Sequence, residues 1–228
     1  MSGNQKGADG REIALEAREI AGARLHSPSA ARNRDPIRDI FLAHMPRKGV
    51  ILEVGSGTGE HAVHIAAAIP EIRWLPGDPD SVSRASIAAW TDYLGLVNVD
   101  PPHTVDVAAA GWEAAFPALD GVVSINMIHI APFEAAKGLI AGAGSLLKPG
   151  GRLFLYGPFS RDGAHTAPSN EAFDASLKSR DARWGVRDLE QEIAPLAARS
   201  GLSLLKVADM PANNLSIIFE KRQASEKA

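Results

Sequence analysis

VILEVGSGTG, residues 50–59, reads as a buried strand that runs into a turn with three glycines. Gly55, Gly57 and Gly59 allow positive φ angles and leave no Cβ where a ligand has to pass close to the backbone. The acidic side chain of Glu53 lies inside the strand just before this turn. The pattern predicts a strand, a turn that binds a nucleotide-sized ligand, and a helix whose free amide groups point at that ligand.

The spacing of the glycines narrows the class of ligand. The sequence has G-x-G-x-G, whereas the dinucleotide fingerprint would place its third glycine at the position of Glu60. The chain has no G-x-x-x-x-G-K-[ST] loop either. NAD, FAD and nucleoside triphosphates are therefore disfavoured. A nucleoside without a pyrophosphate remains, and S-adenosylmethionine fits, because Glu53 can meet its ammonium group while the glycine backbone lies against its amino-acid end.

Composition restricts the partners and the cellular setting. The chain has 228 residues, 45% of them hydrophobic, a net charge of −3 and no cysteine. The charge gives no general attraction for phosphate backbones, so nucleic acid is not an expected partner. The absence of cysteine rules out disulfides and thiolate sites and suits a reducing compartment. Because the start of the chain is polar and no apolar run could span a bilayer, we expect a cytoplasmic protein without membrane contact.

Strands and helices alternate along the chain, which predicts an α/β fold with a mostly parallel sheet, helices on both faces and an antiparallel hairpin at one edge. Residues 1–22 are expected to be an extension that is partly disordered or helical, 23–222 a single domain, and 223–228 a polar tail. The expected helices cover residues 11–25 (a weak pattern), 36–44, 60–69, 81–93, 112–116, 133–147, 170–180 and 188–199. The expected strands cover residues 50–54, 72–76, 103–107, 121–126, 152–156, 203–207 and 215–220.

Acidic residues end two of the expected strands, where a ligand would lie in such a sheet. Asp78 follows the second strand and is predicted to accept hydrogen bonds from ribose hydroxyls. The alternative is a helix cap or turn, but Asp80 is the better cap for the helix from residue 81. Asp106 ends the third strand and can accept from an adenine amino group. An ordinary turn aspartate is nearly as good an interpretation of Asp106.

Polar residues after the fourth and fifth strands are candidates for the reaction itself. Asn126, His129 and Tyr156 would border the reactive group, with His129 as a possible general base or, alternatively, a structural histidine. His61 and His64 lie three apart on a helix but lack a third ligand, so no metal site is expected. The polar residues 161–170 are either a lid that selects the second substrate or a solvated loop. Arg187 is a candidate anchor for an acidic substrate.

Several motifs recur in the order of a known family. SPSAARNRDPI, GSGTGEHAVHIA, WLPGDPD, NMIHIAPF, YGPF, WGVRDLE and MPANNLSIIF resemble the DUF938 family of class I S-adenosylmethionine-dependent methyltransferases. The resemblance implies a Rossmann-like, seven-stranded sheet in the order 3-2-1-4-5-7-6 with an antiparallel last strand. It also implies cofactor binding by Glu53, by the turn residues Gly55, Ser56, Gly57, Thr58 and Gly59, and by Asp78, Asp106 and Asn126. Asn33 and Arg34 are expected to close over the cofactor or the acceptor.

The expected function is methyl transfer from S-adenosylmethionine to a small-molecule acceptor. The alternative is a non-catalytic S-adenosylmethionine-binding protein with a regulatory or scaffold role. After the fourth strand the chain has Asn-Met-Ile-His, whereas enzymes that methylate amino groups of nucleic-acid bases carry Asn/Asp-Pro-Pro-Tyr/Phe, so base methylation is disfavoured. The sequence assigns no oligomeric state.

Overall fold

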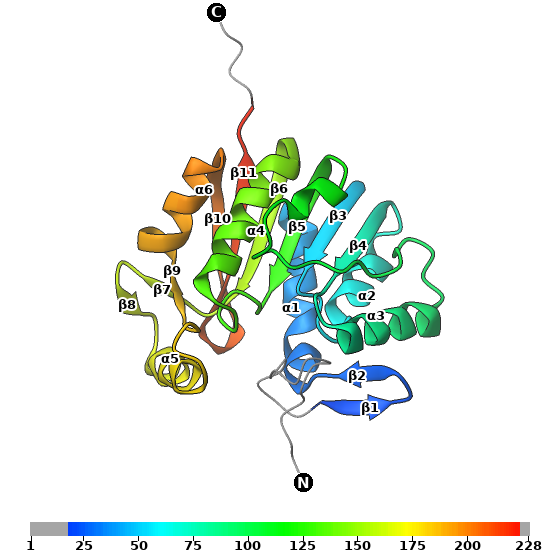
Figure 1. The fold of residues 1–228 in the computed structure, drawn as a ribbon, viewed down its shortest axis with the longest axis horizontal. Helices are drawn as coiled ribbons and strands as arrows, with labels where there is room; N and C mark the ends of the chain where they lie inside the picture. The colour runs from blue at the N-terminus through cyan, green and yellow to red at the C-terminus, as the bar shows by residue number, and fades with distance from the viewer. Residues whose placement is uncertain (1–17, 224–228) are drawn as a thin grey trace, which may run out of the picture.

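A computed structural model describes residues 18–223, and a six-stranded sheet with the order β10-β11-β6-β5-β3-β4 forms the centre of the fold (Figure 1). Strand β11 runs antiparallel to β6 and β10, and the other neighbouring strands are parallel, which confirms the α/β class. The strands are β3 (Gly49–Val54), β4 (Ile72–Gly77), β5 (Leu119–Ile125), β6 (Leu147–Gly157), β10 (Leu202–Met210) and β11 (Asn214–Lys221).

The expectation of seven strands is wrong for this sheet. The segment expected as a third strand makes only isolated parallel bridges to β4, Trp74 with Val99 and Gly77 with His103. Pro101 and Pro102 lie between these two bridges, and proline has no N–H to donate to a continuous ladder. The six strands that form keep the relative positions expected for them, so the carboxyl ends of β3, β4 and β5 still meet at one edge.

Helices cover both faces of the sheet, as expected. On one face, α1 (Pro28–His44) and α2 (Glu60–Ala68) bury Ile37, Phe41 and Ile65 against the sheet, with α3 (Ser81–Leu94) beside α2. On the other face, α4 (Phe133–Leu146) and α6 (Ala194–Arg199) pack on Leu52, Val122 and Leu153. Successive strand residues alternate between these two cores because side chains of a strand point to opposite faces. Among residues 18–223, no helix combines the length and the hydrophobicity of a transmembrane span.

The N-terminal helices differ from the sequence expectation. Helix α1 starts at Pro28 instead of residue 36, because Ser27 caps it by accepting a hydrogen bond from the Ala30 amide and Pro28 occupies its first turn. The helix expected over residues 11–25 is wrong where the structure describes it. There, β1 (Glu19–Ala21) and β2 (Arg24–His26) form a hairpin that turns at Gly22, whose φ is +66°. Residues 11–17 lie outside the described residues.

The segment that follows β6 contains short strands where a loop was expected. Strand β7 (Phe159–Arg161) pairs with β8 (Ala164–His165) and with β9 (Arg187–Asp188) in a three-stranded sheet. Asp188 secures this unit by accepting hydrogen bonds from the Ser160 hydroxyl and the Gly163 amide. The remaining elements are α5 (Pro168–Arg180), a π-helical turn η2 (Leu189–Ile193) that leads into α6, and the 3-10 turns η1 (Trp112–Ala115) and η3 (Pro211–Asn213).

Close packing between α2 and α3 depends on Gly59. A Cβ at Gly59 would lie 2.8 Å from the Ile87 Cα, and the φ of Gly59 is +87°. Gly95 has a similar φ of +62° with no atom within 4 Å of its Cβ position. We expect Gly95→Ala to cost about 1 kcal/mol from backbone strain alone, and Gly59→Ala about 3 kcal/mol because a steric clash is added. Urea unfolding of both variants measures this difference, and equal losses would contradict it.

Candidate functional site

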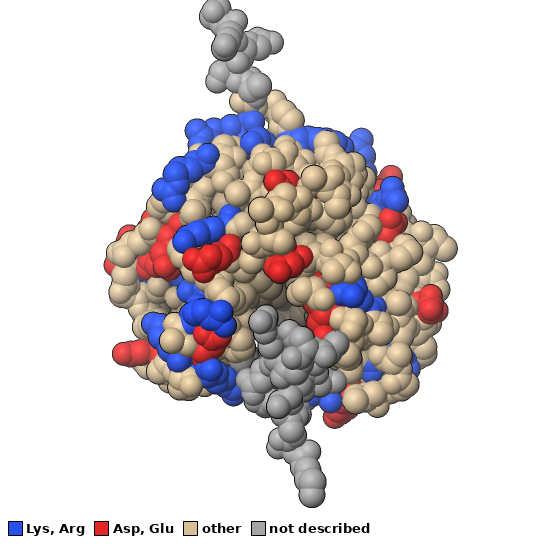
Figure 2. Space-filling model, viewed as in Figure 1, with Lys and Arg blue, Asp and Glu red and all other residues tan. Residues whose placement is uncertain are grey.

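A cavity of about 960 Å³ lies at the carboxyl ends of the strands. It extends from Asp78, after β4, past the ends of β3, β5 and β6 to Asn214 at the start of β11. Four strand spacings of about 4.8 Å make this distance roughly 19 Å, enough for two small ligands end to end. On the face shown in Figure 2, Lys and Arg side chains gather along the top, which Figure 1 shows to be the opposite, amino-terminal edge of the sheet.

Hydrogen bonds to the end of β4 hold the glycine turn. The amides of Gly55 and Ser56 donate to the Gly77 carbonyl at 2.8 and 3.0 Å. The Gly57 amide donates to Oδ2 of Asp78 at 2.9 Å. Gly55 and Gly57 have φ angles of +72° and +56°, and both line the cavity together with Ser56 and Thr58. Gly59, which was expected to bind the cofactor, does not line the cavity and instead packs against α3.

Glu53 is a buried acid at the floor of the cavity, with 1% of its surface exposed. The Trp74 indole donates to its Oε2 at 3.2 Å. Burial raises the pKa of Glu53 to about 7, and hydrogen bonds from Ser56 and Trp74 oppose that rise only in part. A cationic group placed beside this carboxylate would favour its ionised form. The site therefore suits an ammonium group.

Three aspartates lie at the same end of the cavity as Glu53. Asp78 is buried, and its Oδ1 accepts the Asp80 amide at 2.9 Å while its Oδ2 holds the Gly57 amide. Burial raises the pKa of Asp78. Asp80 caps α3 through the Ser83 amide at 2.7 Å, as expected. Asp106 is exposed and lines the cavity, but it also accepts the Ala108 amide at 2.9 Å, so the ligand and turn interpretations of Asp106 are both compatible with the structure.

The opposite end of the cavity is lined by uncharged polar groups. Tyr156 is 2% exposed, and its hydroxyl lies beside the side chains of Asn33 and Asn214. Oδ1 of Asn33 lies 2.8 Å from Nε2 of His61. Burial raises the pKa of Tyr156, so its hydroxyl stays protonated at neutral pH. Arg34, expected beside Asn33 in the site, does not line the cavity and lies near His61, whose pKa burial lowers to about 4.

Asn126 and His129 both line the cavity, as expected. Asn126 has a φ of +54°, and its amide donates to the Tyr156 carbonyl at 2.9 Å. His129 is 1% exposed, and neither ring nitrogen has a hydrogen-bond partner among the residues that the structure describes. Burial, with a smaller contribution from Arg187, lowers the pKa of His129 to about 3. Such an imidazole is neutral but a weak proton acceptor, so its expected role as a general base finds no support here.

Arg187 has a different role from the one expected. Arg187 is 8% exposed and does not line the cavity. It donates to the carbonyls of Ile128 and Ala131 at 3.1 and 2.7 Å. Arg187 therefore holds the loop that carries His129, and its interpretation as an anchor for an acidic substrate is wrong. Most polar residues of the segment 161–170 also do not line the cavity. Arg161 pairs with Glu190, and only Ser169 and Asn170 of this segment line the cavity.

Other lining residues were missed from the sequence. Arg18, Ser27, Ser29 and Arg32 come from the N-terminal part of the described chain. Phe173 comes from α5, and Pro211, Ala212 and Asn214 come from the connection between β10 and β11. Two motifs gave a signal. SPSAARNRDPI, which is typical of the family, contains Ser27, Ser29 and Arg32, and the consecutive asparagines of MPANN favour a left-handed turn. Ala212 and Asn213 have φ angles of +59° and +58°. Within residues 18–223 no cluster of three potential metal ligands is present, and His64 pairs with Asp35 at 2.8 Å.

The family described as "Protein of unknown function (DUF938)" matches residues 24–221 of this chain. The chain belongs to the DUF938 family. A curated relative, the highly reducing polyketide synthase sorA of Penicillium rubens, is 30% identical over 51% of this DUF938 chain, which spans only 5% of that protein.

Solved structures of methyltransferases share the fold of this DUF938 protein. An O-methyltransferase family protein from Burkholderia thailandensis has a TM-score of 0.73 at 16% identity, covering 87% of this chain and 58% of its own. An O-methyltransferase family 2 protein from Planctomyces limnophilus, in complex with apigenin, has a TM-score of 0.71 at 20% identity, covering 85% and 57%. The S-adenosylmethionine-dependent methyltransferase SibL has a TM-score of 0.68 at 18% identity, covering 86% and 56%. The Rossmann-like methyltransferase fold is confirmed, although the chain spans little more than half of each structure.

Glu53 makes the stability of the free protein depend on pH. Its folded pKa of about 7 exceeds the ordinary value of 4.5. As the pH rises, the unfolded chain therefore releases this proton before the folded protein does. The stability that protonated Glu53 contributes below pH 4.5 is lost as the pH rises to about 7. We expect the unfolding free energy of Glu53→Gln, relative to the parent protein, to increase by up to about 3 kcal/mol between pH 5 and pH 8. Urea unfolding at both pH values measures this increase.

The control for this prediction is Glu171→Gln, which changes an exposed glutamate on α5. Its unfolding free energy should differ from that of the parent protein by the same small amount at both pH values. A Glu53→Gln difference that is also constant with pH would show that Glu53 is ionised in the folded protein well below pH 7.

Proposed function

We propose that this protein is an S-adenosylmethionine-dependent methyltransferase with a small-molecule acceptor, its catalytic domain covering residues 23–222. The observation that carries the proposal is the division of one continuous cavity into a carboxylate-rich end at β3 and β4 and an uncharged polar end at β6 and β11. A cationic nucleoside suits the first end. A second, neutral molecule suits the other. The shared fold of the solved methyltransferases supports the same interpretation.

The residues at the carboxylate-rich end fit the cofactor group by group. Glu53 lies where it can bind the ammonium group, and the turn from Gly55 to Thr58 leaves room for the amino-acid moiety. Asp78 keeps lone pairs free on both oxygens for ribose hydroxyls, because each oxygen accepts one backbone amide in the structure. Asp106 lines the cavity, where its carboxylate can accept a hydrogen bond from the adenine amino group.

The bound cofactor supplies a methyl group on a positively charged sulfur that leaves as a neutral thioether. The chain then has to align the acceptor and exclude water, which contributes roughly 7 to 11 kcal/mol in well-oriented systems. We assign this alignment to Asn126 and His129, which line the cavity after β5, and to Tyr156 at the uncharged polar end. We assign His129 the role of a neutral hydrogen-bonding group, because neither ring nitrogen has a side-chain partner among the described residues and its pKa is about 3.

Asp78 provides the test of cofactor binding. We expect Asp78→Asn to weaken S-adenosylhomocysteine binding at least tenfold in calorimetry, because the carboxylate loses strength as an acceptor for two ribose hydroxyls. The control Asp92→Asn changes an exposed aspartate of α3 and should bind like the parent protein. Parent-like affinity of Asp78→Asn would remove the ribose assignment.

Turnover separates an enzyme from a non-catalytic binder. The protein, incubated with S-adenosylmethionine and a fractionated small-molecule extract, should release S-adenosylhomocysteine in at least one fraction. Cofactor binding without release in any fraction would favour the non-catalytic alternative.

His129 provides a test through the pH dependence of the rate. Because its pKa is about 3, the imidazole does not titrate between pH 6 and 9. We expect His129→Gln, which keeps a hydrogen-bonding group, to retain most of kcat and His129→Leu to lose about tenfold, by the same factor at every pH in this range. A deficit that changes with pH around 6 to 7 would instead establish His129 as a general base.

A further inference from the structure

The β1–β2 hairpin is attached to the rest of the molecule through β2 and the residues after it. The Leu25 amide donates to the Ser86 hydroxyl at 2.9 Å, and the Trp90 indole donates to the Leu25 carbonyl at 2.9 Å. The Ser27 amide donates to Oε2 of the buried Glu60 at 2.7 Å. The Arg24 guanidinium lies 3.6 Å from the ring centroid of Tyr93. Strand β2 is therefore firmly fixed on α2 and α3.

Strand β1, by contrast, is exposed along its whole length. It pairs with β2 through three residue pairs, from Glu19 with His26 to Ala21 with Arg24. Ile20 in its middle is 67% exposed, which is unusual for an isoleucine in a strand. Figure 1 shows the hairpin below α3, at the end of the molecule where the strands of the parallel sheet finish.

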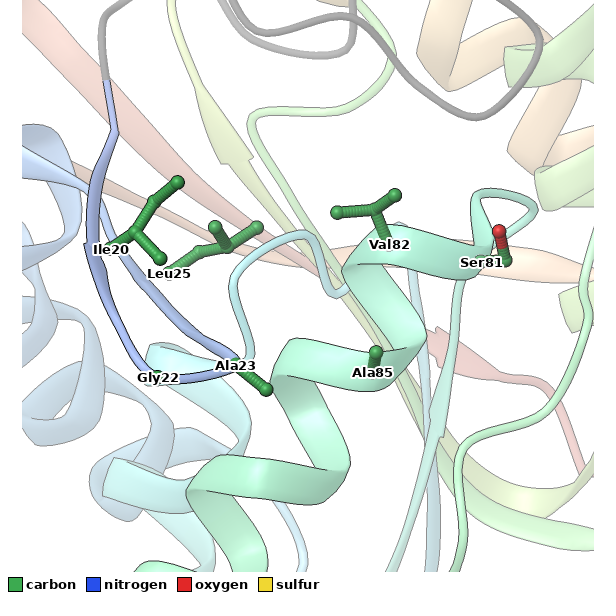
Figure 3. A pocket seen from close by; sticks show the side chains of 7 residues that line it. All are labelled: Ile20, Gly22, Ala23, Leu25, Ser81, Val82 and Ala85. Carbon is green, nitrogen blue, oxygen red and sulfur yellow. The ribbon is translucent and has the colours of Figure 1, made fainter.

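An apolar hollow separates Ile20 from the first turn of α3. The hollow has a volume of about 340 Å³ and is lined by Ile20, Leu25, Val82, Ala85 and their small neighbours. Figure 3 shows Ile20 and Leu25 on one side of the hollow and Val82 on the other. Val82 is itself 38% exposed. A small movement of β1 towards α3 would bury both side chains, which favours a closed position.

The residue that leads into β1 faces the cofactor end of the main cavity. Arg18 lines this cavity, and its guanidinium lies 3.6 Å from the position that a Cβ on Gly57 would occupy. Its charge lowers the pKa of Asp78, against the larger effect of burial. A guanidinium in this place can bind a carboxylate with two parallel hydrogen bonds. The amino-acid end of the cofactor carries such a carboxylate.

We infer that Arg18 binds the carboxylate of the cofactor and that β1 is a flap, which moves about the turn at Gly22 against the fixed β2 and closes when this contact forms. Closure seats Ile20 in the apolar hollow against Val82 and Ala85. This inference rests on the proposed function, because it requires a ligand with an amino-acid moiety. It adds a binding residue and a closing element that the glycine turn and the strand-end aspartates do not supply.

A pair of ligands isolates the carboxylate contact. S-adenosylhomocysteine has the amino-acid moiety, and 5′-methylthioadenosine has the same nucleoside and sulfur without it. We expect Arg18→Gln to weaken S-adenosylhomocysteine at least tenfold while 5′-methylthioadenosine binds as it does to the parent protein. Arg18→Lys should recover part of the loss. Equal weakening of both ligands would show that Arg18 acts through Asp78 and would overturn the carboxylate assignment.

Dissociation kinetics test the flap. We expect Ile20→Ser to release S-adenosylhomocysteine about tenfold faster in stopped-flow displacement, with little change in the association rate, because only the closed state loses contacts. The control Val97→Ser changes a fully exposed valine (100%) after α3 and should release the ligand like the parent protein. Unchanged release from Ile20→Ser would overturn the flap.

A charge control and the binding by the parent protein separate failure of this inference from failure of the proposed function. Arg73→Gln changes an exposed arginine paired with Asp100 and controls for loss of a positive charge near β4. It should bind both ligands normally. If the parent protein binds neither ligand, the proposed function itself fails. If the parent protein binds S-adenosylhomocysteine and the Arg18 and Ile20 variants behave like it, only the flap and its arginine fail.

Discussion

The glycine turn keeps its shape because the end of the neighbouring strand binds it. Backbone amides of Gly55 and Ser56 share the Gly77 carbonyl, and the Gly57 amide reaches the Asp78 carboxylate. These bonds continue the contact between β3 and β4 past Val54, the last residue of β3. As a result, one aspartate both shapes the turn and faces the cavity, so the conformation of the turn and the affinity for a ligand are coupled through Asp78.

The carboxylates of the cavity lie at one of its ends, and keeping them ionised costs free energy in the protein without a ligand. Burial raises the pKa of both Glu53 and Asp78, which means that their ionised forms are destabilised without a partner. Strained backbone occurs elsewhere along the cavity, where Asn126 and Ala212 have positive φ angles. Such features persist where the surrounding structure compensates for them and are common at binding sites. A cationic ligand would remove part of the electrostatic cost.

Local signals in the sequence predicted the parts of the site that depend on local geometry. The glycines of the turn, Asp78 at the end of β4 and the Asp80 cap all follow from neighbouring residues. The parts that failed depend on distant contacts. Ser27–Pro28 starts α1, but Pro36 offered a competing start, and only packing of Ile37 and Phe41 shows that the helix continues through it. The bonds from Arg187 to the His129 loop join residues more than fifty positions apart, so no local pattern reveals them.

The decisive measurement for this site is a crystal structure with bound S-adenosylhomocysteine. We expect the ribose hydroxyls within hydrogen-bond distance of Asp78, the ammonium group beside Glu53, and the amino-acid moiety along Gly55 and Gly57. A ligand bound elsewhere, or a nucleoside in this cavity that contacts neither Asp78 nor Glu53, would contradict it.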